Sequence, residues 1–74
     1  MNQQRRTKTK AVIRRLNECI DDLSTIKEDE DDARDNIPEN LQEGEAYHAS
    51  EECSDKLEDA ISWIKDVVDS LETI

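Results

Sequence analysis

The stretch "DNIPENLQEGE" (residues 35–45) holds the single proline of the chain, Pro38, and its single glycine, Gly44. Proline disfavours helical geometry at the residue before it and is favourable as the first residue of a new turn. A helix that approaches Asn36 is therefore expected to end there, and another is expected to start beyond the proline. The stretch predicts one short connection between two long elements.

Before this connection, apolar residues recur at alternating intervals of four and three. This a/d spacing is typical of a helix that packs along one seam. With Leu16 at position a, the a/d residues are Val12, Leu16, Cys19, Leu23, Ile26, Glu30, Ala33 and Ile37. Ile13 and Ile20 then fall at e and widen the stripe. We expect Thr7 or Thr9 to cap the helix start.

The same rhythm returns after the connection. Its a/d residues are Ala46, Ser50, Cys53, Leu57, Ala60, Ile64, Val67, Leu71 and Ile74. Ile61 and Val68 fall at e, and Trp63 falls at g. Two runs of this length on either side of one break favour two long helices.

These patterns predict an all-α fold, an antiparallel and coiled-coil-like hairpin of two helices. We place the helices at about 6–35 and 43–73, with the turn at about 36–42. A short connection forces neighbouring helices to run antiparallel. Residues 1–74 then form a single domain, because so short a chain holds one domain at most.

Composition by itself suggests disorder, since 34% of the residues are hydrophobic and 41% are charged. The heptad arrangement argues against disorder. No segment reaches the ~20 apolar residues of a membrane span, and the basic start lacks the apolar run of a signal peptide. We therefore expect a cytoplasmic protein with reduced cysteines.

The net charge of −10 is unevenly distributed along the chain. Residues 1–15 carry six bases and no acid, whereas the remaining residues carry twenty acids and four bases. Such a split bears on partners rather than on fold. The acidic part should repel nucleic acid and should not bind it directly.

Two helices alone do not cover so wide an apolar stripe. Its extra residues sit in the half that contains both termini, beside the expected seam: Ile13, Ile20, Ile61, Trp63 and Val68. An exposed apolar patch of this kind marks an interface. We therefore expect these five residues to form a homodimer interface, which makes a four-helix bundle.

The expected register has two further consequences. If Asp35 meets Glu43, Cys19 and Cys53 lie on the order of 9 Å apart along the axis, too far for a disulfide. Two free thiols that face the core are therefore predicted. Glu30 and Ser50 should lie close to each other near the turn, as a polar layer that sets the register.

No catalytic or metal site is predicted. The chain has one histidine, His48, at an outward f position, whereas Cys53 faces the seam. A nucleophile needs a base held in place by a third group, and residues i and i+5 do not share a helix face. The acidic run "EDEDD" lacks the glycine turn of a calcium loop. We expect no enzyme activity, no metal and no cofactor.

The segment "DDARDNIPENLQEGEAYHASEECSDKLEDAISWI" resembles small uncharacterised acidic proteins of Gram-positive bacteria and their phages. Those proteins carry an Asn-Leu-Pro-Glu-x-Leu-Gln turn and a second helix rich in Glu-Glu-Ala-Ile repeats. The matching residues here are Asp35, Asn36, Pro38, Glu39, Leu41, Gln42, Glu45, Leu57, Ala60 and Ile61. Where those proteins often have a serine, this chain has Glu43. The resemblance implies a helical hairpin and no established activity. If a phage encodes the chain, we expect it in the host cytoplasm.

The acids occupy outward positions and are densest near the turn. The expected partner-binding surface consists of Glu28, Asp31, Asp32, Asp35, Glu39, Glu45, Glu52 and Asp55. Carboxylates ~5–6 Å apart on a helix resemble the phosphates of one nucleic-acid strand. This favours a non-enzymatic inhibitor, such as an anti-restriction or anti-CRISPR protein, that occupies a basic, nucleic-acid-binding site of a host protein. The alternative is a structural or regulatory dimeric adaptor that docks through Leu41 and Tyr47.

Overall fold

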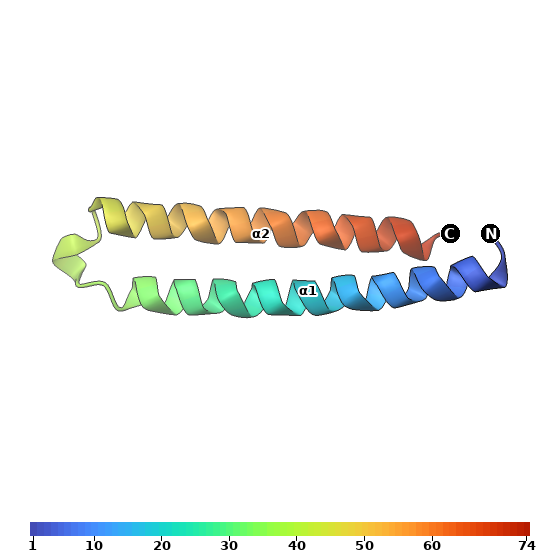
Figure 1. The fold of residues 1–74 in the computed structure, drawn as a ribbon. Coiled ribbons are helices and arrows are strands. Elements are labelled where there is room, and N and C mark those ends of the chain that lie inside the picture. The colour runs from blue at the N-terminus through green and yellow to red at the C-terminus, as the bar shows by residue number, and fades with distance from the viewer.

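The computed structural model describes residues 1–74 and contains two long helices and one helical turn. Helix α1 spans Gln3–Asp35, the 3-10 turn η1 spans Glu39–Leu41, and helix α2 spans Glu45–Glu72. The helices run antiparallel, with both chain ends at one end of the rod and η1 at the other (Figure 1). The extents are 60 × 15 × 12 Å. The predicted all-α hairpin is confirmed.

Helix α1 begins with Asn2 rather than with a threonine. The Asn2 side chain, Oδ1, accepts a hydrogen bond from the Arg5 backbone N–H at 2.8 Å, as an N-cap residue does. The hydroxyls of Thr7 and Thr9 instead donate to the carbonyls of Gln3 and Arg5, one turn earlier. The expectation that a threonine caps the helix is therefore wrong, and the helix starts earlier than residue 6.

The connection is closed by short backbone hydrogen bonds. The Ile37 N–H donates to Arg34 O at 3.0 Å and ends α1, and the Leu41 N–H donates to Pro38 O at 2.8 Å to form η1. Gly44 caps α2 without a side-chain hydrogen bond, in an extended conformation with φ −81°. A Cβ on Gly44 would lie 3.2 Å from the Leu41 carbonyl oxygen, so this close approach favours glycine. Helix α2 consequently starts at Glu45, later than residue 43.

The core of the hairpin lies in the half that contains the termini. Ile20, Ile61 and Val68 are the buried apolar residues, with exposed fractions of 8%, 9% and 5%. Four half-buried apolar residues pack against them: Ile13, Leu16, Leu23 and Ile64. The seam is therefore formed by a and e positions. The prediction that the e residues lie beside the seam is wrong.

The d positions, which were predicted to face the opposite helix, lie outside the seam instead. Val12, Ile26, Val67 and Ile74 are exposed, as are both cysteines. Because positions a, d and e all carry apolar residues, the two helices could pack through a and d or through a and e. The larger apolar residues favour one of these pairings. At adjacent positions in the terminal half, e supplies Ile20 and Ile61 where d supplies the smaller Cys19 and Ala60. Burying the larger residue of each pair removes more apolar area from water.

Candidate functional site

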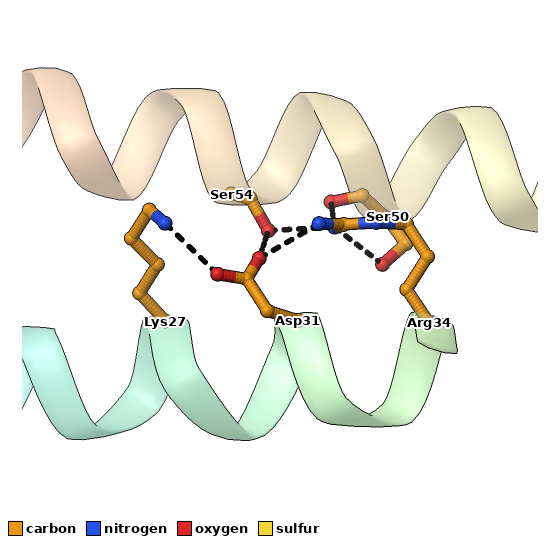
Figure 2. A network of polar contacts seen from close by, with 5 residues as sticks. All are labelled: Lys27, Asp31, Arg34, Ser50 and Ser54. Atoms are coloured by element: carbon orange, nitrogen blue, oxygen red, sulfur yellow. Dashed lines mark hydrogen bonds and ion pairs between the residues drawn. The ribbon is translucent and has the colours of Figure 1, made fainter. Parts of the chain in front are cut away.

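A polar network joins the two helices near the turn, where the apolar core ends (Figure 2). Asp31 of α1 is its centre, because its Oδ1 accepts from Ser54 Oγ at 2.6 Å and from Arg34 Nη2 at 2.8 Å. Asp31 Oδ2 accepts from Lys27 Nζ at 2.9 Å. Arg34 Nη1 donates to Ser54 Oγ at 2.8 Å and reaches the carbonyl and hydroxyl oxygens of Ser50 at 3.3 Å.

Spacing along α1 explains how this network forms. Lys27, Asp31 and Arg34 follow one another at intervals of four and three residues, so they share one helix face. Lys27 and Arg34 occupy the same e position that carries Ile20 in the apolar half. Ser54 lies at e on α2 and is buried, with 5% of its surface exposed. The seam therefore changes from apolar to polar without changing its heptad positions.

The network favours the charged form of each ionisable member. The hydrogen bond from Ser54, followed by those from Lys27 and Arg34, holds the pKa of Asp31 well below its ordinary value. The hydrogen bond to the Asp31 carboxylate likewise raises the pKa of Lys27 and of Arg34. Asp31 therefore stays ionised at every physiological pH, and its charge is matched by two neighbouring bases.

This arrangement corrects two predictions. Ser50 does take part in a polar layer, but its partner is Arg34 and not Glu30, which lines a groove described below. Asp31 was expected on the acidic partner-binding surface. Its carboxylate is instead turned toward α2 and engaged by three side chains, so it is not free to meet a basic partner.

The other seven acids of the predicted surface are exposed. They are Glu28, Asp32 and Asp35 on α1, Glu39 in η1, and Glu45, Glu52 and Asp55 on α2. The helical acids among them occupy c and f positions, which point away from the seam. The acids of α1 and those of α2 therefore line opposite edges of the rod, and the two rows approach each other at the turn. A flat basic site would contact one row, or the tip.

Helix α2 carries the longer acidic row. Its exposed members are Glu45, Glu52, Asp55, Asp59, Asp66 and Asp69. Glu45 and Asp69 are twenty-four positions apart, which corresponds to ~36 Å of helix at ~1.5 Å per residue. No lysine or arginine occupies a c or f position of this row.

The five residues of the predicted dimer interface divide into two groups. Ile20, Ile61 and Val68 are buried between α1 and α2, and Ile13 packs against them, so these four stabilise the hairpin itself. Trp63 differs, since 66% of its surface is exposed. It remains available to a partner.

Trp63 belongs to an exposed face that the sequence did not predict. In antiparallel helices that meet through a and e, both rows of d residues point to the same side of the pair. A groove of about 610 Å³ lies on that side and is lined by Ile26, Asp29, Glu30, Cys53, Lys56 and Leu57. We call this side, with its d and g residues from both helices, the d face.

Both cysteines are free, as predicted, but they are exposed rather than core-facing. The contact of Asp31 with Ser54 sets the register. Cys53 therefore lies near the level of Asp31, twelve residues from Cys19 along α1. That separation is roughly 18 Å, far beyond the reach of a disulfide.

The remaining ionisable residues show no further cluster. The His48 ring, through Nδ1, lies 3.2 Å from Glu51 Oε1 on the outside of α2. No group of three or more His, Cys, Asp or Glu side chains is placed to hold a metal ion. Neither helix contains a stretch apolar enough to cross a membrane.

Comparisons with protein-family models, with curated proteins and with solved structures found no match for this chain.

Proposed function

We propose that this chain is a non-enzymatic interaction protein whose exposed acids in the turn half occupy a basic site of a partner protein, one that otherwise holds nucleic acid. The observation that carries the proposal is the geometry of the acids. A rod about 60 Å long displays unpaired carboxylates along both outer edges. Regularly spaced negative charge on a stiff support matches what a phosphate-binding protein recognises.

Local energetics support the same proposal. Residues 26–59 carry fourteen acids and three bases, and two of those bases, Lys27 and Arg34, are engaged by Asp31. Like charges at this density repel one another and destabilise the fold. Sequences keep such local conflicts where a function requires them. An inhibitor of a restriction or CRISPR effector of the host is the biological role that fits this surface, in line with the resemblance to phage proteins.

The test compares two charge-matched variants as bait in host lysate. In one, Asp32→Asn, Asp35→Asn and Glu52→Gln remove three negative charges from the turn half. In the other, Asp66→Asn, Asp69→Asn and Glu72→Gln remove the same charge from the terminal half. The first should lose a partner that the second and the unchanged chain retain. The captured protein should bind duplex DNA or RNA, and added duplex or high salt should release the bait.

The adaptor function is the second candidate, and exposed apolar side chains favour it. Leu41 is exposed at the tip and Trp63 on the d face, whereas Tyr47 is half-buried. A partner that docks on these residues would stay bound at high salt and would ignore added nucleic acid. That result, with equal capture by both charge variants, would overturn the nucleic-acid-mimic proposal.

We also propose that the chain functions as a homodimer. Four of the five residues of the predicted interface stabilise the hairpin itself. The exposed apolar residues of the d face, rather than those four, therefore support the homodimer. A single rod of this kind has a thin core with three buried apolar residues. A second copy is a common way for so small a chain to gain core.

A further inference from the structure

We infer that two hairpins pair through their d faces with the turn of each copy against the chain ends of the other. This inference rests on the proposed homodimer and names its surface and orientation. It is independent of the acidic edges, which point away from the d face.

The d face has the composition of an unfilled interface. Ile26 is 51% exposed and Val67 49% exposed, and the d residues between them, Cys19 and Ala60, have small side chains. The groove of about 610 Å³ runs between α1 and α2 at Ile26 and Leu57. Exposed apolar side chains beside a groove of this size mark an interaction surface.

The register of the hairpin places the centre of this face. Asp31 contacts Ser54 across the seam, so Ala60, six residues after Ser54, lies at the level of residue 25. Ile26 and Ala60 therefore lie side by side at about the middle of the d stripes. A two-fold axis that crosses the rod here would relate the two copies.

Charge selects the orientation. The turn half of the hairpin, residues 26–59, carries fourteen acids and three bases, a net charge of −11. The terminal half, residues 1–25 and 60–74, carries six acids and seven bases, a net +1. If both turns lay at the same end, −11 would face −11. Pairing opposite ends sets each acidic half against the half that holds the six N-terminal bases.

Side-chain size favours the same orientation. Along α2 the d residues are small near the turn, at Ala46 and Cys53, and large near the end, at Val67 and Ile74. With opposite ends paired, the small residues of one copy meet the large residues of the other. The two helices then stay evenly spaced, as close packing requires.

In this arrangement the exposed Trp63 packs against the second copy. It lies three residues beyond Ala60, about 4.5 Å along the axis. The groove-lining residues Lys56 and Leu57 lie about equally far on the other side of Ala60. The axis therefore brings each Trp63 over Lys56 and the groove of the second copy, where an indole packs on apolar surface and attracts an ammonium group.

One pair of like charges opposes this pairing. Asp22 and Asp29 occupy g positions of α1 at nearly equal distances on either side of the axis. Each Asp22 would lie near Asp29 of the second copy. Replacing Asp22 by Asn should therefore tighten the dimer, which is an unusual outcome for a surface substitution.

Assembly is tested by sedimentation equilibrium together with the emission of the single tryptophan. The full chain should sediment as a dimer, and dilution to monomer should shift the Trp63 emission to the red. Trp63→Glu should raise the dissociation constant at least tenfold. Ser62→Glu, at an exposed neighbouring position outside the d face, should leave it within about twofold. A monomeric parent chain at high concentration overturns both the homodimer and this inference.

Orientation is tested separately by a spin-label distance. Asn40→Cys, in a chain with Cys19→Ala and Cys53→Ala, places one nitroxide at the turn of each copy. The inferred pairing sets the two labels at least roughly 30 Å apart, because Asp35 alone lies nine residues beyond Ile26. A dimer with the labels closer than roughly 20 Å keeps the homodimer and overturns the orientation. The lysate experiment tests the acidic surface independently of both results.

Discussion

Ser54 Oγ donates to Asp31 Oδ1 over 2.6 Å, and this contact joins α2 to α1 where the apolar core has ended. Ser54 is buried there, and the Asp31 carboxylate also forms ion pairs with Lys27 and Arg34 of its own helix. In the acid-rich half of the hairpin, one carboxylate is therefore hydrogen-bonded between the helices, while many others face solvent.

Neutralising Asp31 should destabilise the hairpin, whereas neutralising its neighbour Asp32 should not. Asp31→Asn removes the charge that Lys27 and Arg34 approach, while Asp32 is exposed and surrounded by other acids. Thermal melts followed by circular dichroism should show a lower Tm for Asp31→Asn and an unchanged or higher Tm for Asp32→Asn. Equal melting of the two variants would show that the network contributes nothing.

Low pH should remove the contribution of Asp31 to the stability of the hairpin. Its pKa in the folded chain lies below the ordinary aspartate value of 3.8, so folding favours the ionised form. The resulting stabilisation is complete above the unfolded pKa and is lost as the pH falls through the folded one. The difference in Tm between the parent chain and Asp31→Asn should be constant near neutral pH and should shrink below about pH 4. A difference that grows in acid would contradict the assignment.

The position of the seam can be tested with two isoleucines on one helix. Ile20 is buried at an e position, and Ile26 is exposed at d. In urea melts of the monomer, Ile20→Ala should lower the free energy of unfolding by about 2–5 kcal/mol, the usual effect of truncating a buried isoleucine. Ile26→Ala should have a much smaller effect. The reverse order would support a seam formed by a and d positions.

Both thiols should react rapidly in the folded protein. Cys19 and Cys53 are free and exposed, on the outside of the seam. A thiol reagent should label both before the chain unfolds, at a rate close to that of an unfolded control. Reductant should leave the melt unchanged. Slow labelling of the monomer would place the thiols in the core, and slow labelling at high concentration alone would indicate burial by a second copy.

The sequence by itself determined the number, approximate length and direction of the helices. Pro38 in a short connection stops α1, and two heptad runs of similar length on either side leave an antiparallel hairpin as the natural solution. The free state of the cysteines and the exposure of most acids could also be predicted, because both depend on coarse register and on outward heptad positions.

Only the tertiary structure decided which two of three apolar rows form the seam. Positions a, d and e all carry apolar residues, and periodicity alone does not rank d against e. The larger side chains of Ile20 and Ile61, beside Cys19 and Ala60 at d, favour e in the terminal half. The contacts of Arg34 with Ser50 and Ser54 across the seam extend the same choice to the turn. Relative to the predicted seam, each helix is rotated about its axis so that row e takes the place of row d. Because a helix is rigid, this rotation moves all d residues outward together, including Ile26 and Cys53.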